Sequence, residues 1–544
     1  MPDNRLLPIG SDECLGRVIA VSPSGIMALI ERHAPETNGA SPLAMGSLVK
    51  IPTGNSTLYL MVTGLRAPLP DLVSSDREMK LAELELLGEI LHGTTSSPGT
   101  FQRGVSWFPT LEDTVYRTSL DDFALIYAPP DVATAAIGTV HPHADVPAYL
   151  LIDDLLGKHF SIVGTTGSGK SCAVATILRA VIDCNPNAHV VIIDPHNEYA
   201  AAFGEHCVLL SPDNGLHLPY WLFNFEEISA IVLGVEHDVD QIKILGEAIM
   251  FAKQASFTKI GLEKNGTIDT PAPYRMSEVL RYLDTAMGSL SRPESVANYQ
   301  AVKSRVLSMQ TDPRYAFVFG SSLALRDDMA EILSQLFRIP VDGKPITIID
   351  ISAVPSEVLN IVISVVCRLT FDFAMWSAKS IPITIVCEEA HRYAPRNREA
   401  GFEPAKRALS RIAKEGRKYG VSICVVTQRP SDLAEGLLSQ CNTLFALRMT
   451  NQDDQAIIRD AVPEASHGLM NFLPALRNGE AIVVGEGVSM PMRVHFAPLL
   501  DGNSPKSATA SFSAAWSNES GGLAEIERTI DRWRRGVRHN SASQ

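Results

Sequence analysis

Long apolar runs are missing from this chain of 544 residues. No uninterrupted run approaches the roughly 20 apolar residues that cross a bilayer. The sequence also lacks an opening basic segment followed by an apolar stretch, which is the pattern of a secretory leader. We therefore expect a soluble, cytoplasmic protein with no membrane among its partners.

Clustered cysteines are missing as well. The eight cysteines are scattered, form no Cys-x-x-Cys pair and do not combine with histidines at metal-ligand spacing. This distribution excludes a disulfide-stapled scaffold and a zinc-cluster protein. Several cysteines lie in apolar runs, which is typical of reduced core residues.

Positive charge is scarce overall, because the chain carries a formal net charge of −14. This balance excludes a surface built entirely for nucleic acid, although it allows a locally basic channel. One segment, residues 391–420, is nevertheless basic. Three interpretations stay open for it: arginine fingers that enter a neighbour's nucleotide site, contacts to DNA phosphates, or a solvated helix surface. Its charged residues are Arg392, Arg396, Arg398, Lys406, Arg407, Arg411, Lys414, Arg417 and Lys418, against Glu399, Glu403 and Glu415.

Aromatic residues are few in the basic segment, so stacking on the bases of single strands is not favoured there. The composition of the whole chain, 45% hydrophobic and 20% charged, is that of an ordinary globular protein. At this length we expect two to four domains.

The order of β-favouring and helical patterns indicates several regions. Short β runs between residues 15 and 65 predict a small barrel of about five strands, and residues 78–91 look helical. We expect an N-terminal β-barrel over 1–67, a connecting helix and linker over 68–150, the first part of an ATPase core over 151–225, a helical insertion over 226–315, the second part of the core over 316–500, and a flexible linker with a C-terminal basic helix over 501–544.

From residue 160 onward, strands alternate with helices, which predicts an α/β fold with a mostly parallel sheet. The expected strands are Phe160–Val163, Val190–Asp194, Ile346–Ile351, Ile383–Cys387, Val421–Thr427 and Thr443–Leu447, with Ala481–Val484 and Met492–Phe496 closing the core.

The first of these strands runs into Gly-Thr-Thr-Gly-Ser-Gly-Lys-Ser at residues 164–171, and an apolar helical pattern follows. A strand, a glycine-rich loop and a helix start form a cradle for phosphate, because backbone N–H groups can point at one anion. Lys170 would reach the β- and γ-phosphates and Ser171 would hold Mg²⁺. The alternative is a glycine-rich turn that arose by chance and binds no nucleotide. The expected cofactor-binding residues are Gly164, Thr165, Thr166, Gly167, Ser168, Gly169, Lys170, Ser171 and Cys172.

Two carboxylates, Glu388 and Glu389, end the strand Ile383–Cys387. In a P-loop enzyme, such a strand delivers one acid to the Mg²⁺ shell and a second acid to the attacking water. We assign Glu388 to the metal and Glu389 to the water. An exposed acidic strand end is the alternative without function.

Two further polar residues follow buried-type strands. Asp194 ends Val190–Asp194, where it could face the phosphates together with His196 or Glu198, or could instead cap the next helix. Gln428 follows Val421–Thr427, from where an amide could sense the γ-phosphate or orient water.

Together these motifs resemble the HerA branch of the HerA/FtsK ATPases. The resemblance rests on the P-loop at 164–171, Asp-Pro-His-Asn-Glu-Tyr at 194–199, Glu-Glu-Ala-His-Arg-Tyr at 388–393, Arg-Ile-Ala-Lys-Glu-Gly-Arg-Lys-Tyr-Gly at 411–420 and Thr-Gln-Arg-Pro-Ser-Asp-Leu at 427–433. It covers nearly the whole chain except the helical insertion and the tail. The chain departs from the usual pattern at Asn197, where glycine is frequent, and at Glu388, where aspartate is frequent.

The resemblance implies a RecA-like core in a homohexameric ring that binds ATP and Mg²⁺ between subunits and moves double-stranded DNA through its pore. It implies that Glu389 activates water, that Gln428 senses the γ-phosphate, and that Arg417, with Arg411 and Arg448 as alternatives, reaches the neighbour's nucleotide. It also implies a partner: a NurA-type nuclease in DNA end processing, or a sirtuin-like or nuclease effector in defence against phage.

A second hypothesis is an assembly scaffold, in which ATP binding organises and activates a partner enzyme. The insertion, the barrel and the tail helix would supply the surfaces. A monomeric helicase with two tandem cores fits less well, because the sequence shows one P-loop core.

Overall fold

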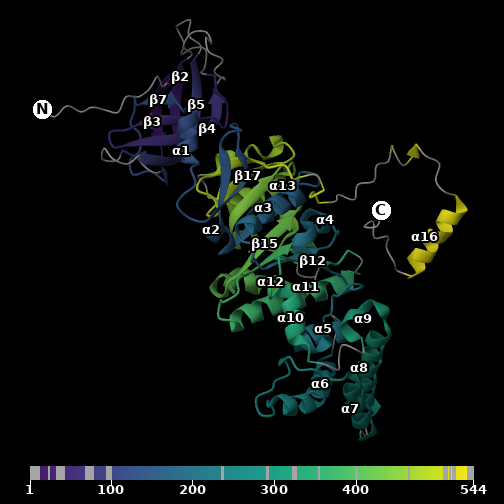
Figure 1. The fold of residues 1–544 in the computed structure, drawn as a ribbon. Coiled ribbons are helices and arrows are strands. Elements are labelled where there is room, and N and C mark those ends of the chain that lie inside the picture. Colours follow the sequence, from purple (N-terminus) through teal and green to yellow (C-terminus); the bar gives the residue numbers. More distant parts are fainter. Residues whose placement is uncertain are drawn as a thin grey trace. The chain divides into compact units, whose positions relative to one another are not determined.

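The computed structural model describes residues 13–22, 25–31, 43–67, 79–92, 101–234, 238–289, 293–320, 327–352, 354, 356–397, 402–434, 436–463, 466–500, 502–505, 513, 516–517 and 522–535 (Figure 1). It divides into two compact units. The first comprises Met1–Ala188, Phe371–Gly401 and Leu409–Leu499, and the second comprises His189–Thr370, Phe402–Ala408 and Leu500–Gln544.

The first unit begins with a closed antiparallel barrel, drawn in purple and blue in Figure 1. Six strands pair in the order β2-β1-β7-β3-β4-β5, and β5 pairs back to β2, so the ring closes. A short strand, β6, extends the other side of β5. The strands are β1 (Cys14–Ser22), β2 (Gly25–Glu31), β3 (Leu48–Pro52), β4 (Ser56–Arg66), β5 (Met79–Leu91), β6 (Phe101–Arg103) and β7 (Thr114–Arg117).

Alternating side chains fill the barrel interior. Val18, Ala28, Ile51, Leu60 and Val115 come from five different strands and belong to one buried apolar cluster. The period-2 alternation of the β runs places these residues on the inner face. The barrel therefore carries its own hydrophobic core.

The expectation of a helix over residues 78–91 is wrong, because Met79–Leu91 is the longest strand of the barrel. Its Leu, Glu and Ala content favours a helix locally, but pairing with both β2 and β4 buries Ala82 and Leu84 in the barrel core. Tertiary pairing therefore overrides the local propensity.

The expected boundaries of the barrel need correction for the same reason. The barrel reaches Arg117 rather than residue 67, and it has six strands rather than about five. Residues 68–150, expected to form a connecting helix and linker, instead supply β5, β6, β7, the short helix α1 (Leu120–Ile126), β8 (Thr134–Val140) and most of β9 (Pro147–Leu151).

The α/β part of the first unit is a mixed sheet. Its strands run in the order β14-β15-β10-β16-β17-β18-β8-β9, parallel from β14 to β16 and antiparallel from β16 to β9. The remaining bounds are β10 (His159–Val163), β14 (Ile383–Cys387), β15 (Val421–Thr427), β16 (Cys441–Leu447), β17 (Glu480–Gly485) and β18 (Met492–Phe496). The strands expected from sequence are confirmed, whereas β8 and β9 were not anticipated.

Helices of the first unit connect these strands. The longest, α3 (Lys170–Cys184), follows the P-loop and buries Val174, Ile177, Leu178 and Val181 on its apolar face. The others are short: α2 (Ile152–Leu156), η5 (Ala390–Arg392), η6 (Gly416–Tyr419), η7 (Pro430–Asp432), η8 (Leu438–Gln440), α13 (Gln452–Ala461), α14 (His467–Met470) and η10 (Leu473–Ala475).

The second unit contains three parallel strands in the order β12-β13-β11, with the bounds β11 (Val190–Asp194), β12 (Cys207–Leu210) and β13 (Ile346–Asp350). Among the described residues between 225 and 319, all regular elements are helices, as expected for the predicted insertion, and residues 261–275 connect α6 to α7 without regular structure. The helices are α4 (Ala200–Phe203), η2 (Gly204–His206), η3 (Tyr220–Leu222), α5 (Phe225–Leu233), α6 (Val239–Ile260), α7 (Met276–Ser289), α8 (Pro293–Thr311), η4 (Pro313–Tyr315), α9 (Ala316–Phe319) and α10 (Met329–Phe337).

A buried ion pair anchors α5. Glu227 accepts hydrogen bonds from Arg368, at 3.0 and 3.1 Å, and from Ser364, at 2.8 Å. Only 1% of the Glu227 side chain is exposed, so loss of either partner would leave a buried charge without compensation.

Two long helices, α11 (Ser356–Trp376) and α12 (Glu403–Glu415), carry residues of both units. Among the described residues, α11 alone has the length and apolar content of a membrane span, with a mean hydropathy of 1.8 over Val358–Trp376. That stretch is 72% buried inside the protein and contains Arg368 and Asp372, as expected of a core helix. The tail helix α16 (Leu523–Arg535) forms where a basic helix is expected, and most of residues 501–522, expected to be a flexible linker, lie outside the described part.

Gly88 provides a test of the corrected strand β5. A Cβ at this position would lie 2.2 Å from the backbone oxygen of Gln102, so alanine must displace β6. We expect Gly88→Ala to lower the free energy of unfolding by about 1–3 kcal/mol, measured as a shift of the urea midpoint. Gly54→Ala is the matched control, because nothing lies within 4 Å of its Cβ position. Equal midpoints for the two variants would contradict the pairing of β5 with β6.

Candidate nucleotide-binding site

The site begins with the register of four parallel strands in the first unit. Val163 at the end of β10 is level with Thr427 of β15 on one side and with Ala446 of β16 on the other. Cys387 at the end of β14 is level with Val425. The residues that follow these strands therefore meet at one edge of the sheet, which is where ligands bind in parallel α/β sheets.

The P-loop leaves β10 with backbone conformations that require glycine. Gly167 and Gly169 have φ values of 75° and 101°, in the left-handed region. At Gly164, a Cβ would lie 2.7 Å from Ser168 Oγ and 2.8 Å from Leu447 Cβ. The loop can therefore wrap tightly and direct N–H groups inward, as a phosphate cradle requires.

The loop is fixed to the neighbouring strand through its backbone. Thr165 donates from its N–H and from its Oγ1 to the carbonyl oxygen of Arg448, both at 3.0 Å. Lys170, at the start of α3, is 7% exposed, and its Nζ donates to the carbonyl of Thr165 at 3.3 Å. Its ammonium is therefore held against the loop where it would meet phosphate oxygens.

Ser168 supplies a direct indication of a missing partner. Its side chain is fully buried, and its Oγ has no hydrogen-bond partner among the described residues. An orphaned buried hydroxyl inside a glycine-rich loop at a helix N-terminus fits the binding of an anion. Ser171 and Cys172 occupy the first turn of α3, with Ser171 partly exposed and Cys172 exposed.

Gln428 contacts the P-loop directly. Its Oε1 accepts a hydrogen bond from the Thr166 hydroxyl. The structure therefore brings the amide expected to sense the γ-phosphate into the loop that would hold that phosphate.

Glu388 and Glu389 lie at the same edge, immediately after β14. Glu388 is 3% exposed and Glu389 is 7% exposed. Tyr393 Oη donates a hydrogen bond to the backbone carbonyl of Glu388 at 2.7 Å. Glu389 has a φ of 52°, a left-handed conformation that is uncommon outside glycine and concentrates at functional sites. Its Oε2 is buried and accepts no hydrogen bond from the described residues.

His391 is a site residue that the sequence reasoning missed, although it lies within the Glu-Glu-Ala-His-Arg-Tyr motif. Its Nδ1 lies 3.2 Å from Glu389 Oε2 and 3.0 Å from Thr427 Oγ1. Burial lowers the pKa of His391, and the nearby carboxylate of Glu389 opposes this decrease only in part. The imidazole is therefore neutral at pH 7, with Nδ1 between the orphaned carboxylate and the last residue of β15.

Asp194 belongs to the second unit and is fully buried at the end of β11. Its Oδ1 accepts from the N–H of His196, at 3.1 Å, and its Oδ2 accepts from those of Glu198 and Tyr199, at 2.9 and 3.0 Å. Burial raises its pKa to about 6. These contacts favour the alternative in which Asp194 organises the turn before α4, within which Asn197 takes a left-handed φ of 54°.

The candidate arginine fingers lie in different places. Arg417 is exposed on η6, which precedes β15, whereas the P-loop follows the far end of the neighbouring β10. Seven residues of β15 separate the two ends by about 20 Å, beyond the reach of an arginine side chain. Arg448 lies at its own P-loop, and Arg411 stacks on Phe371 at 4.1 Å and lies 3.5 Å from Asp372.

The residues present fit a nucleotide with Mg²⁺. The cradle offers a buried orphan hydroxyl, a lysine and a helix N-terminus, which suit phosphates, and Ser171 and Glu388 offer oxygen ligands of the kind that Mg²⁺ prefers. Within the described ranges, no group of three or more His, Cys, Asp or Glu side chains could hold a metal by itself. Mg²⁺ would therefore need phosphate oxygens as further ligands.

Comparisons with known proteins agree with this geometry. The family described as "Helicase HerA, central domain" matches residues 135–370. The chain is 27% identical over 420 residues to the DNA double-strand break repair helicase HerA of Pyrococcus furiosus, which covers 70% of this chain and 72% of that protein. It is 24% identical over 451 residues to the probable DNA double-strand break repair helicase HerA of Methanocaldococcus jannaschii, which covers 77% and 85%.

Among solved structures, VirB4 of Thermoanaerobacter pseudethanolicus superposes with a TM-score of 0.48 at 15% identity, covering 69% of this chain and 99% of that chain. The bacterial conjugative coupling protein TrwB superposes with a TM-score of 0.46 at 14% identity, covering 72% and 94%. The matched family and the curated relatives, together with the P-loop and its neighbouring carboxylates, show that the chain is similar to the HerA helicases and carries the site of a P-loop ATPase.

Proposed function

We propose that this chain is an ATP-driven motor that translocates or unwinds double-stranded DNA. The curated relatives named above are DNA double-strand break repair helicases, and the family matched over residues 135–370 is that of a helicase. A motor needs a site that hydrolyses ATP rather than one that only binds it. The observation that carries this proposal is the position of Glu389.

Glu389 has the properties of a water-activating base. Its buried Oε2 accepts no hydrogen bond from the described residues, although His391 Nδ1 lies 3.2 Å away, and the left-handed backbone holds the residue at the edge of the sheet from which the P-loop also departs. A carboxylate in this state can accept a proton from water. Glu388, one residue earlier, would complete the Mg²⁺ shell with Ser171.

The other residues position the reactants. ATP with Mg²⁺ supplies the γ-phosphoryl group and neutralises its charge when bound. Lys170 and the P-loop N–H groups would hold the phosphates, and Gln428, already bonded to Thr166, would register whether the γ-phosphate is present. His391 would hold the carboxylate of Glu389 in place, because its Nδ1 lies between Glu389 and Thr427.

We propose a homohexameric ring on the basis of the position of Arg417. This exposed arginine lies at the end of the strands opposite its own P-loop, so it can serve only a nucleotide held by another subunit. Burial lowers the pKa of His159, at the start of β10, to about 4, and the charge of Arg417 adds to this decrease. The arginine therefore lies near the amino ends of the strands.

Double-stranded DNA in the ring pore would meet part of the basic segment. Arg407 is paired with Glu226 at 2.7 Å and Arg411 with Asp372 at 3.5 Å, whereas Lys414 and Lys418 are exposed. Arg398 lies outside the described residues. The proposal includes a cytoplasmic ring and a partner, either a NurA-like nuclease in DNA end processing or a sirtuin-like or nuclease effector in anti-phage defence.

The first prediction concerns hydrolysis. We expect Glu389→Gln to bind ATP normally but to hydrolyse it at least a hundredfold more slowly, because the base is lost. Lys170→Ala should lose ATP binding, and Glu205→Gln on the exposed helix η2 should behave like the parent protein. ATP binding by equilibrium titration and phosphate release with and without duplex DNA are the measurements.

Normal turnover by Glu389→Gln would transfer the role of base to Glu388 or Asp194. The scaffold hypothesis would instead be supported if the rate of ATP hydrolysis did not change with duplex DNA and if Lys170→Ala still activated a partner enzyme fully.

His391 gives a prediction about pH. Because burial lowers the pKa of His391, the residue becomes protonated only below pH 6.5, where an imidazolium would pair with Glu389 and withdraw the base. Turnover should therefore fall as the pH decreases through this lowered pKa. We expect His391→Ala to reduce kcat about tenfold and to change the acid limb of the pH profile, while leaving ATP affinity intact.

His391→Asn serves as the conservative variant, because its side-chain amide can occupy the place of Nδ1. It should recover part of kcat while lacking the titration of an imidazole. An unchanged acid limb in both variants would show that His391 does not act on Glu389.

Arg417 allows the ring to be tested directly. We expect Arg417→Ala to abolish most hydrolysis while preserving ATP binding. Mixing Arg417→Ala with Glu389→Gln subunits should restore some activity, because an intact Glu389 in one subunit can then face an intact Arg417 in the next. Native mass measurement of the mixtures, with ATP and duplex DNA, reports the assembly. A monomer under all conditions would refute the ring.

A further inference from the structure

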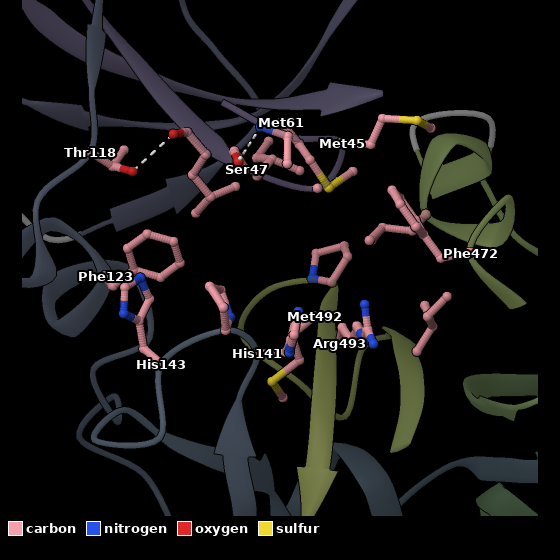
Figure 2. A pocket seen from close by; sticks show the side chains of 18 of the residues that line it. Met45, Ser47, Met61, Thr118, Phe123, His141, His143, Phe472, Met492 and Arg493 are labelled. Atoms are coloured by element: carbon pink, nitrogen blue, oxygen red, sulfur yellow. Dashed lines mark hydrogen bonds between the residues drawn. The ribbon is translucent and has the colours of Figure 1, made fainter. Parts of the chain in front are cut away.

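The first unit contains a cavity whose lining includes none of the P-loop residues. It has a volume of about 450 Å³ and is lined by the barrel strands β3 and β4, by α1, by the turn before β9 and by β18 (Figure 2). Cavities of this size accommodate small organic ligands. The proposed ATPase mechanism uses none of the residues that line it.

Most of the lining is apolar and suits a flat ring. Figure 2 shows Met45 and Met61 on the barrel side, Phe123 on a second wall and Phe472 on a third. Methionine sulfur and aromatic faces both pack favourably against aromatic rings. The cavity therefore offers a surface for an aromatic group.

Among the described residues, the lining contains basic side chains but no carboxylate. Arg117, His141, His143 and Arg493 all line the cavity, and none of its lining residues is an aspartate or glutamate. This is unusual in a chain with a net charge of −14. Arg117 is paired with Glu13 at 2.6 Å and the pKa of His141 is lowered, so Arg493 is the group that would meet a negatively charged ligand.

Arg493 is only partly satisfied. Its Nη2 donates to Glu480, which lies outside the lining, at 2.7 Å, while its buried Nε has no acceptor among the described residues. A buried guanidinium N–H without an acceptor costs free energy that an added anionic oxygen would recover.

The pKa of the neighbouring His141 reflects the electrostatic potential in the cavity. Burial lowers this pKa, the nearby Arg493 and Arg477 lower it further, and Glu480 opposes the decrease. The surroundings of His141 are therefore electropositive. An anion bound beside it would stabilise the imidazolium and raise this pKa.

We propose that this cavity is a binding site for a small aromatic anion, whose acidic group pairs with Arg493 and whose ring lies between Met61, Phe123 and Phe472. Such a ligand would contact both the barrel and the sheet of the first unit. The site is separate from the P-loop, and the proposal does not depend on the ATPase mechanism.

The test is titration calorimetry of the full chain with 2-naphthoate, an aromatic carboxylate that carries no phosphate. We expect saturable binding of one molecule per chain, unchanged in Lys170→Ala, which excludes the P-loop as the site. Arg493→Gln should weaken binding about tenfold or more, because a charge-assisted hydrogen bond is lost. Arg477→Gln is the matched control, since Arg477 is exposed and does not line the cavity.

Arg493→Gln removes a hydrogen-bond donor from the buried Glu480, so the variant can lose binding by misfolding. A second variant that leaves this contact intact is therefore needed. Met45 is 47% exposed at the cavity wall, so Met45→Trp can narrow the cavity without disturbing the core. We expect it to weaken binding as well.

Proton linkage provides an independent readout. Because the anion raises the pKa of His141, binding should take up protons, and the uptake at pH 6 should exceed that at pH 8, measured in buffers of different ionisation enthalpy. Absence of saturable binding, equal affinity in Arg493→Gln and the parent, or binding abolished by Lys170→Ala would each overturn the proposal.

Discussion

The parallel register of β10 between β15 and β16 is the constraint on which the candidate site depends. It makes Val163, Thr427 and Ala446 level, so the P-loop, Gln428 and Arg448 leave the sheet at one edge. The backbone of Thr165 is then fixed on the carbonyl of Arg448. A slip of one residue would move Thr165 away from the carbonyl of Arg448 and Thr166 away from Gln428.

The same register creates a polar path from the proposed base to the phosphate cradle. Glu389 Oε2 lies beside His391 Nδ1, which contacts Thr427 Oγ1, and the next residue, Gln428, accepts a hydrogen bond from Thr166. The contacts of His391 with Thr427 and of Gln428 with Thr166 join segments that follow different strands. Under the proposed mechanism, a change at the γ-phosphate would reach Glu389 through these adjacent groups and would couple hydrolysis to the state of the nucleotide.

Local sequence predicted much of this site, for identifiable reasons. Continuous apolar runs predicted β10, β11, β14 and β15, because strands buried on both faces leave no polar position. Glycine spacing predicted the P-loop, because only glycine tolerates its torsions and its close approach to Leu447. The helix predicted for residues 79–91 is wrong. Their composition favours a helix, and only pairing with β2 and β4 makes them a strand.

The sequence by itself determined the nucleotide site, because its loop, its lysine and its flanking strand and helix are contiguous and their geometry is local. Only the tertiary structure decided how the other groups are used. It surrounded the Asp194 carboxylate with three backbone N–H groups, placed His391 against Glu389, put Arg417 at the opposite end of the strands, and gathered basic groups around the cavity at Arg493. The contacts of Asp194 and His391 are local in sequence but accompany left-handed backbone conformations at Asn197 and Glu389, and the cavity joins residues far apart in the chain.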